Sequence, residues 1–431
     1  MELLYPKPEL LAPAGGPSQL KAAIRFGADA VYLAVDRFGM RARADNFALE
    51  DITDVVAYAH ARGVKVHITL NIIMGRDDIA VLPAYCEALD AAGVDAFIVA
   101  DMGAFSIAKK HAPHVDLHVS TQASVMNAAA ACAWHNLGAK RVVCAREMSL
   151  EDIAALRADV PSDLEIEAFA HGAMCMAYSG RCLLSAGMTG RSGNRGACAQ
   201  SCRWSYALVE EKRPGEYFPI EEDQTGSFIL NAQDLNMIRH VDELRQAGIS
   251  SLKIEGRNKR AFYVATVVHA YRQVLDGGDV EVASRELDSI SHRPYSTGFY
   301  YGLATQATQQ DGYVKECVHA ATVEECVPAE SVSGQPRWRV TAVCHNCFDE
   351  GGELEVLSPH RDRGVVHARE IAWLAPSDGG KPFVERGDVP LNEVRALSVE
   401  FPVPKVNRSR EHYVFYVEEE LRPGDYLSRR L

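Results

Sequence analysis

The sequence predicts an α/β protein made of a (β/α)8 barrel of the TIM type and a small antiparallel β-barrel domain at the C-terminus. Short apolar runs rich in β-branched residues alternate with segments of helical spacing up to about residue 305. Beyond that point the pattern changes to a period near two with glycine-rich turns. The chain has 431 residues and is 47% hydrophobic, which suffices for two or three domains. We therefore expect a catalytic barrel domain over 1–305, and a linker with the β-barrel domain over 306–431.

Eight apolar runs are candidates for the barrel strands. They are residues 9–15, 28–35, 64–71, 95–101, 116–122, 140–147, 164–171 and 251–257. Amphipathic segments such as 52–63 and 82–93 lie between them and end in glycine, as helices commonly do. Alternating strands and helices of this kind predict a parallel sheet with helices outside it, and eight units favour a closed barrel. An open doubly wound sheet is the alternative.

The barrel is expected to be irregular between its seventh and eighth strands, because residues 172–250 are inserted there. Within the insertion, the stretch SFILNAQDL at 227–235 could itself supply a strand. The C-terminal β domain is predicted from the alternation in 337–375 and 409–421.

Composition and charge narrow the class of protein. The N-terminus lacks the basic start and apolar run of a secretory signal, and no apolar stretch approaches the ~18 residues that a membrane span needs. We therefore expect a cytoplasmic protein with no membrane partner, in which the eleven cysteines are mostly free thiols. The formal net charge of -13 argues against nonspecific nucleic-acid binding by the whole surface, but a local basic site stays open.

Polar side chains gather where the predicted strands end. The C-terminal strand ends of such barrels face one shared mouth, where these barrels place their chemistry. The residues at those ends are Asn71, Asp101, Thr121, Gln122, Arg146, Glu147, His171, Glu255 and Arg257. Their convergence favours a polar ligand at the mouth. The alternative is that strand ends simply meet loops, which are polar in most proteins.

Four cysteines fall close together in the insertion. Cys175, Cys182, Cys198 and Cys202 have the spacing C-x6-C-x15-C-x3-C. Four thiolates can ligate zinc or an iron–sulfur cluster. Because zinc sites usually use close cysteine pairs and only the last pair is close, we favour a 4Fe-4S cluster. The segment 171–205 also holds four arginines and no Asp, Glu or Lys, and such guanidinium groups could offset the negative charge of a cluster and bind carboxylates or phosphates.

Other interpretations of the cysteines stay open. The segment could be a solvated loop that holds reduced structural cysteines, and Cys175 beside His171 could be imagined as the thiolate and base of a peptidase. The three further cysteines argue against the peptidase. The sequence CHNC at 344–347 has the spacing of a metal half-site, but it lies in the β domain without a second pair.

The stretch EAFAHGAMCMAYSGRCLLS, residues 167–185, resembles the signature of peptidase family U32. The resemblance covers nearly the whole chain, and the other matching stretches are ELLAPAGG at 9–16, GACAQSCRW at 196–204, LNAQDL at 230–235, LKIEGR at 252–257 and RPYSTGFYYG at 293–302. It implies an oxygen-independent hydroxylase that carries a 4Fe-4S cluster on the four cysteines named above. The branch with this length and a C-terminal β domain is similar to enzymes that form 5-hydroxyuridine at the tRNA wobble position and depend on prephenate.

The resemblance also implies partners and residue roles. The anticodon loop of tRNA would deliver its base to the barrel mouth, with the β domain as a clamp on the tRNA stem. Arginines would hold the two carboxylates of prephenate, and position alone suggests the general acid or base. The substrate-binding candidates are Asn71, Gln122, Arg146, Arg195 and Arg257, and the acid-base candidates are His171, Asp101, Glu147 and Glu255.

Four other functions stay open. Relatives in the family hydroxylate a ribosomal-RNA cytidine or the ubiquinone ring, the family's historical label is peptidase, and a noncatalytic RNA-binding factor stapled by zinc would also fit the cysteines. The sequence does not predict an oligomeric state.

Overall fold

The chain divides into two compact units in a computed structural model. The first comprises Met1–Leu287 and His292–Val314, and the second comprises Asp288–Ser291 and Lys315–Leu431. The structure describes residues 5–39, 46–175, 179–204, 207–208, 218–219, 231–302, 306–307, 314–332, 335–361, 363–377 and 391–431.

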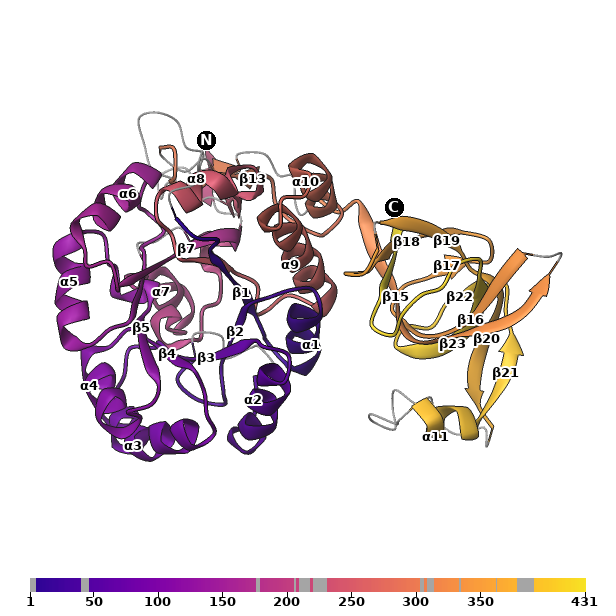
Figure 1. The fold of residues 1–431 in the computed structure, drawn as a ribbon, viewed down its shortest axis with the longest axis horizontal. Coiled ribbons are helices and arrows are strands. Elements are labelled where there is room, and N and C mark those ends of the chain that lie inside the picture. The colour runs from indigo at the N-terminus through magenta and orange to yellow at the C-terminus, as the bar shows by residue number, and fades with distance from the viewer. Residues whose placement is uncertain are drawn as a thin grey trace. The chain divides into compact units, whose positions relative to one another are not determined.

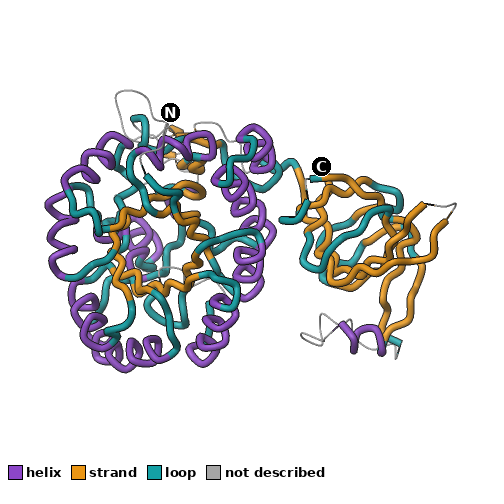
Figure 2. Tube along the Cα trace, in the orientation of Figure 1, coloured by secondary structure: helices purple, strands orange, loops and turns teal. Residues whose placement is uncertain are grey.

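A closed barrel of eight parallel strands forms the centre of the first unit (Figures 1 and 2). The strands are β1 (Glu9–Pro13), β2 (Ala30–Leu33), β3 (Lys65–Leu70), β4 (Ala96–Val99), β5 (Asp116–Val119), β6 (Arg141–Val143), β7 (Glu165–Ala173) and β12 (Ser251–Ile254). Each strand pairs in parallel with the next, and β12 pairs with both β1 and β7, which closes the ring. The predicted (β/α)8 barrel is confirmed, and the open sheet is excluded.

Helices surround this barrel, as the outer ring in Figure 2 shows. They are α1 (Pro17–Arg25), α2 (Ile52–His60), α3 (Arg76–Ala91), α4 (Met102–His111), α5 (Ala128–Leu137), α6 (Leu150–Asp159), α8 (Val241–Gln246), α9 (Ala261–Leu275) and α10 (Val280–Asp288). Capping residues in the sequence determine where several of these helices begin. The side chains of Asp101, Asn127 and Ser149 each accept a hydrogen bond from a backbone N–H in the first turn of the helix that follows.

The insertion between β7 and β12 adds short elements without opening the barrel. They are α7 (Leu184–Thr189), β8 (Ala207–Leu208), β9 (Phe218–Pro219), β10 (Asn231–Ala232) and β11 (Asp234–Asn236). Strand β11 pairs antiparallel with the end of β7 and parallel with β13 (Tyr295–Ser296), and β10 pairs with β14 (Gln306–Ala307). The expectation that this stretch supplies a strand is confirmed.

The second unit is an antiparallel sheet, as predicted for the C-terminal domain. Its eight strands run in the order β19-β18-β24-β15-β16-β23-β20-β21. In chain order they are β15 (Cys317–Val332), β16 (Gln335–Cys344), β18 (Glu353–Leu357), β19 (Gly364–His367), β20 (Arg369–Pro376), β21 (Ser398–Pro402), β23 (Glu411–Val417) and β24 (Tyr426–Arg430), with the pair β17 (Phe348–Asp349) and β22 (Lys405–Val406) and helix α11 (Leu391–Ala396). Cys344 lies in the core of this unit while Cys347 is exposed.

None of the helices in the described ranges is long and apolar enough to cross a membrane.

Candidate active site

A cavity lies at the carboxyl ends of the barrel strands. It brings together five of the predicted site residues, which are Asn71, Gln122, Arg146, Glu255 and Arg257. The other lining residues are Tyr32, Thr69, Ile98, Ser120, Thr121, Val143, Phe169 and Lys253. The lining therefore combines three cationic side chains, one carboxylate, several hydroxyl and amide groups and two aromatic rings.

The two arginines of the cavity are held in place by their neighbours. The Arg146 guanidinium stacks on the Phe169 ring at 4.0 Å, and its Nη2 lies 3.6 Å from Glu255 Oε2. Arg257 is buried and donates from Nη1 to Thr69 Oγ1 at 3.3 Å. Pre-positioned guanidinium groups of this kind suit the recognition of carboxylates. The cavity therefore presents two guanidinium groups of the kind that recognise anions.

Sequence reasoning missed Lys253, which also lines the cavity. Its Nζ lies 2.6 Å from Glu167 Oε1 and 4.4 Å from the centre of the Tyr32 ring. The signal was present in β12, where fully buried Leu252 and Ile254 alternate with the polar Ser251 and Lys253. Because side chains alternate along a strand, this pattern places Lys253 on the inner face of the barrel.

The interior of the barrel holds buried charged side chains beside apolar ones such as Leu11 and Ile98, unlike the purely aliphatic layers usual in this fold. Arg141 donates to Glu9 Oε1 at 2.6 Å and to Glu167 Oε2 at 3.0 Å, and it also contacts Glu165 at 2.6 Å. Glu167 in turn pairs with Lys253. A continuous series of ion pairs therefore leads from the amino ends of the strands to the mouth cavity.

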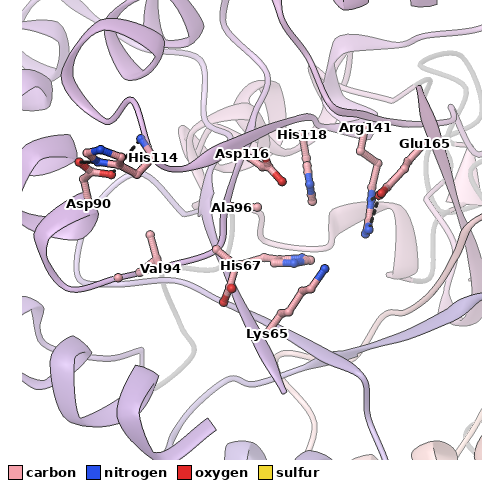
Figure 3. A pocket seen from close by; sticks show the side chains of 12 residues that line it. Lys65, His67, Asp90, Val94, Ala96, His114, Asp116, His118, Arg141 and Glu165 are labelled. Carbon is pink, nitrogen blue, oxygen red and sulfur yellow. Dashed lines mark hydrogen bonds and ion pairs between the residues drawn. The ribbon is translucent and has the colours of Figure 1, made fainter. Parts of the chain in front are cut away.

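A second pocket lies at the amino ends of the strands (Figure 3). His67, His118 and Arg141 point into it, and the two imidazole rings meet edge to face with their centroids 4.9 Å apart. Burial lowers the pKa of His67 to about 4, with Glu9 opposing this effect and Arg141 adding to it. Burial and the charge of Arg141 hold the pKa of His118 well below its usual value. Both imidazoles are therefore neutral at pH 7.

These histidines predict a pH-dependent stability. The unfolded chain takes up protons on His67 below about pH 6.5, whereas the folded chain does so only near pH 4. The free energy of unfolding should therefore fall as the pH drops through this window, by about 1.4 kcal/mol per pH unit for each such histidine. Urea unfolding of the wild type and of His67→Gln between pH 6.5 and 5 measures the effect. The variant should lose less stability over this range. An equal fall of the free energy of unfolding with pH in both proteins would contradict the prediction.

Four of the predicted site residues lie outside the cavity lining. Asp101 caps α4 by accepting from Ala104 N at 2.9 Å. Glu147 accepts from Ser179 N at 2.6 Å, and Arg195 donates to Ile73 O at 2.7 Å and to Asp78 Oδ2 at 2.8 Å. These three side chains organise loops around the mouth.

The fourth, His171, is buried among aromatic rings. Its ring centroid lies 5.5 to 6.1 Å from those of Tyr263, Tyr271 and Tyr295. Burial, with smaller effects from the charges of His292 and Lys259, lowers the pKa of His171 to about 3. A neutral, enclosed imidazole of this kind is a poor proton acceptor near neutral pH.

The segment that carries the four cysteines, residues 171–205, is hydrogen-bonded to loops at the mouth of the barrel. The backbone N–H of Ser179 donates to Glu147, and its backbone carbonyl accepts from the Ser124 hydroxyl. Within the segment, Asn194 Nδ2 donates to Cys182 O at 3.0 Å. Arg195 and the bond from Ile73 N to Asn194 O, at 3.0 Å, tie the segment to the loop after β3. The segment therefore contacts the same end of the barrel as the cavity.

The four cysteines have the right chemistry for a cluster, since none of them forms a disulfide and all lie in one short segment. Cys175 is exposed, and Cys182, Cys198 and Cys202 are partly buried. Over the described ranges, however, no three His, Cys, Asp or Glu side chains are grouped closely enough to hold a metal ion. The ligand set therefore stays a prediction.

Gly180, which lies between Cys175 and Cys182, tests how closely the cysteine segment packs against the mouth of the barrel. Gly180 has φ +71°, and a Cβ added there would lie 2.2 Å from Gln122 O. Gly190, with φ +68°, has open space around it. We expect Gly190→Ala to cost only the conformational strain of about 1 kcal/mol. Gly180→Ala should cost roughly 2 kcal/mol more, because the backbone of Gln122 must move. Urea unfolding compares the two, and equal losses would contradict the close packing.

The fold and the site define a (β/α)8-barrel protein with a charged mouth cavity and a cysteine-bearing segment at the same end. The family model of peptidase family U32 matches residues 15–310, and the chain belongs to this family.

Several proteins with 34 to 39% sequence identity to this chain have names that state a function. The chain is 38% identical to "tRNA hydroxylation protein P1" of Bacillus subtilis, covering 85% of this chain and 87% of the relative. It is 34% identical to "tRNA hydroxylation protein P" of Escherichia coli, covering 86% and 92%. It is also 39% identical to the "23S rRNA 5-hydroxycytidine C2501 synthase" of Escherichia coli, covering 64% of this chain and 41% of that protein.

Proposed function

We propose that this protein is an RNA-modifying hydroxylase that forms 5-hydroxyuridine at the wobble position of tRNA, with prephenate as co-substrate and a 4Fe-4S cluster as cofactor. The observation that carries the proposal is the similarity, over most of the length of both chains, to relatives named for tRNA hydroxylation. A relative named for rRNA hydroxycytidine synthesis supports hydroxylation of a pyrimidine base in RNA. Because tRNA is the proposed substrate, the proposed location is the cytoplasm.

The mouth cavity supports a dicarboxylate co-substrate. Prephenate carries two carboxylates, and Arg146 and Arg257 offer two guanidinium groups in one cavity. Asn71 and Gln122 add amide groups that can donate to the remaining oxygens. Glu255, 3.6 Å from Arg146, orients that guanidinium and is the acid-base candidate that lines the cavity.

The four cysteines support a cluster near the mouth. Cys175, Cys182, Cys198 and Cys202 would hold it, and a 4Fe-4S cluster supplies one-electron redox chemistry when bound. The segment that carries these cysteines also carries Arg181 and Arg191, whose charges would favour both an anionic cluster and an RNA backbone.

A peptidase mechanism receives less support from the geometry. His171 is enclosed by tyrosine rings, and among the described residues no hydrogen bond joins it to Cys175. Ser179 lies against the carboxylate of Glu147 rather than against a histidine. Neither arrangement activates a nucleophile in the manner of a serine or cysteine peptidase.

Mass spectrometry of tRNA nucleosides tests the proposal. Deleting the gene, in a strain lacking other routes to this nucleoside, should remove 5-hydroxyuridine, and expressing the wild-type chain should restore it. Purification without air should give a coloured protein that contains iron and sulfide. Unchanged 5-hydroxyuridine in the deletion strain would overturn the proposed function.

A further inference from the structure

We propose that Lys253 is a catalytic residue that forms an imine with the carbonyl carbon of a keto acid bound in the mouth cavity. This inference deepens the proposed function, on which it rests for the presence of a carboxylated co-substrate in that cavity. Prephenate contains such a keto acid in its side chain. The inference concerns a covalent step that neither the fold nor the family resemblance assigns.

The first support is the position of the amine. Lys253 lines the cavity although its side chain is only 6% exposed, and its Nζ contacts Glu167 Oε1 at 2.6 Å. The faces of Tyr32 and Phe169 lie 4.4 Å and 5.8 Å from Nζ. In register, Lys253 pairs directly with Phe169 of β7, the residue on which Arg146 stacks. The amine and a carboxylate-binding guanidinium therefore share one wall of the cavity.

The second support is the distribution of charge. The Lys253 ammonium is already neutralised by Glu167 at 2.6 Å, so it has little charge left to attract a free carboxylate. Arg146 and Arg257 are the groups that can bind the carboxylates. What Lys253 adds is a nucleophilic nitrogen, and its burial lowers the pKa of the ammonium group and so favours the neutral amine.

The reaction balances without an oxidant or a reductant. A proton passes from Nζ to Glu167 Oε1, and the neutral nitrogen attacks the carbonyl carbon, forming the C–N bond of a carbinolamine as Glu167 passes that proton on to the carbonyl oxygen. A second proton follows from nitrogen to the same oxygen, and Glu167 is again a carboxylate. The C–O bond then breaks and the oxygen leaves as water. Overall, an ammonium and a ketone give a protonated imine and water, and both protons of the water come from nitrogen. The protonated imine keeps the positive charge beside Glu167, so the buried ion pair is preserved.

Chemical trapping tests the proposal directly. The full-length protein is incubated with pyruvate, and separately with prephenate, in the presence of sodium borohydride, which reduces an imine to a stable secondary amine. Peptide mass spectrometry should then find the reduced adduct on Lys253. Lys253→Met should lose at least 90% of the labelling, an order-of-magnitude expectation of roughly tenfold or more, because Lys253 supplies the one primary amine among the described residues that line the cavity.

Two controls keep the test decisive. Lys65→Met removes an exposed lysine from the opposite end of the barrel and should leave the labelling of Lys253 unchanged. The double variant Lys253→Met with Glu167→Gln removes the ion pair as a unit, and it should also fail to label while its circular dichroism matches that of the wild type. No adduct in the wild type, or equal labelling of Lys65, would overturn the inference.

The outcomes also separate this inference from the proposed function. An adduct on Lys253 in a protein that does not restore 5-hydroxyuridine would refute the tRNA hydroxylase and leave the imine standing. Restored 5-hydroxyuridine without any adduct would refute the imine and leave the hydroxylase standing.

Discussion

Cys182→Ala is expected to abolish both the visible absorbance of the purified protein and the formation of 5-hydroxyuridine in cells. A 4Fe-4S cluster needs four thiolates, and alanine offers no ligand in place of the missing one. Cys182 is well placed for this test because Asn194 donates to its backbone carbonyl rather than to its sulfur. The backbone anchor of the segment therefore survives the substitution. Iron and sulfide analysis after anaerobic purification, with tRNA nucleoside mass spectrometry, measures the two losses.

Cysteines outside the segment supply matched controls. Cys347 is exposed in the second unit, and Cys132 is partly buried on α5. Cys347→Ala and Cys132→Ala should keep full iron content and full 5-hydroxyuridine. A Cys182→Ala protein that keeps its cluster, or a control that loses it, would contradict the assignment of the four cysteines.

The strands could be predicted from sequence because their outward faces are strongly apolar. In β1 and β4, for example, the runs ELLAP and AFIV are almost entirely buried. Parallel strands covered by helices require such runs, so periodicity and length locate them within a few residues. The count of eight then favoured the closed barrel.

The interior of the barrel could not be predicted in the same way, because its charged residues do not interrupt the apolar pattern enough to be noticed. Glu167 and Lys253 each stand between apolar neighbours, and their partnership depends on the pairing of β7 with β12 across 86 residues of chain. The C-terminal ends of the predicted strands located Arg146 and Arg257 correctly, since both line the cavity. They were a poorer guide for His171, because β7 continues to Ala173 and pairs there with β11, which encloses the ring.

Arg141→Met is expected to destabilise the protein by roughly 3 to 5 kcal/mol, the usual cost of removing one partner from a buried ion pair. The guanidinium contacts Glu9, Glu165 and Glu167 inside the barrel, and it helps to lower the pKa of Glu9 to about 2 against the opposing effect of burial. Without Arg141, Glu9 loses its guanidinium partner and Glu167 keeps only Lys253. The pKa of Glu9 should therefore rise, and urea unfolding at pH 7 should show the loss of stability.

An exposed ion pair gives the matched comparison. Lys7 and Asp276 lie 2.8 Å apart with about half of each side chain exposed, so Lys7→Met should cost less than about 1 kcal/mol. The contrast separates the effect of burial from that of the ion pair itself. Lowering the pH should also narrow the difference between Arg141→Met and the wild type, because protonation of Glu9 in the variant removes the uncompensated charge. If Arg141→Met were as stable as Lys7→Met, the charged barrel interior would not be held together by this arginine, and the series of ion pairs from base to mouth would have to be abandoned.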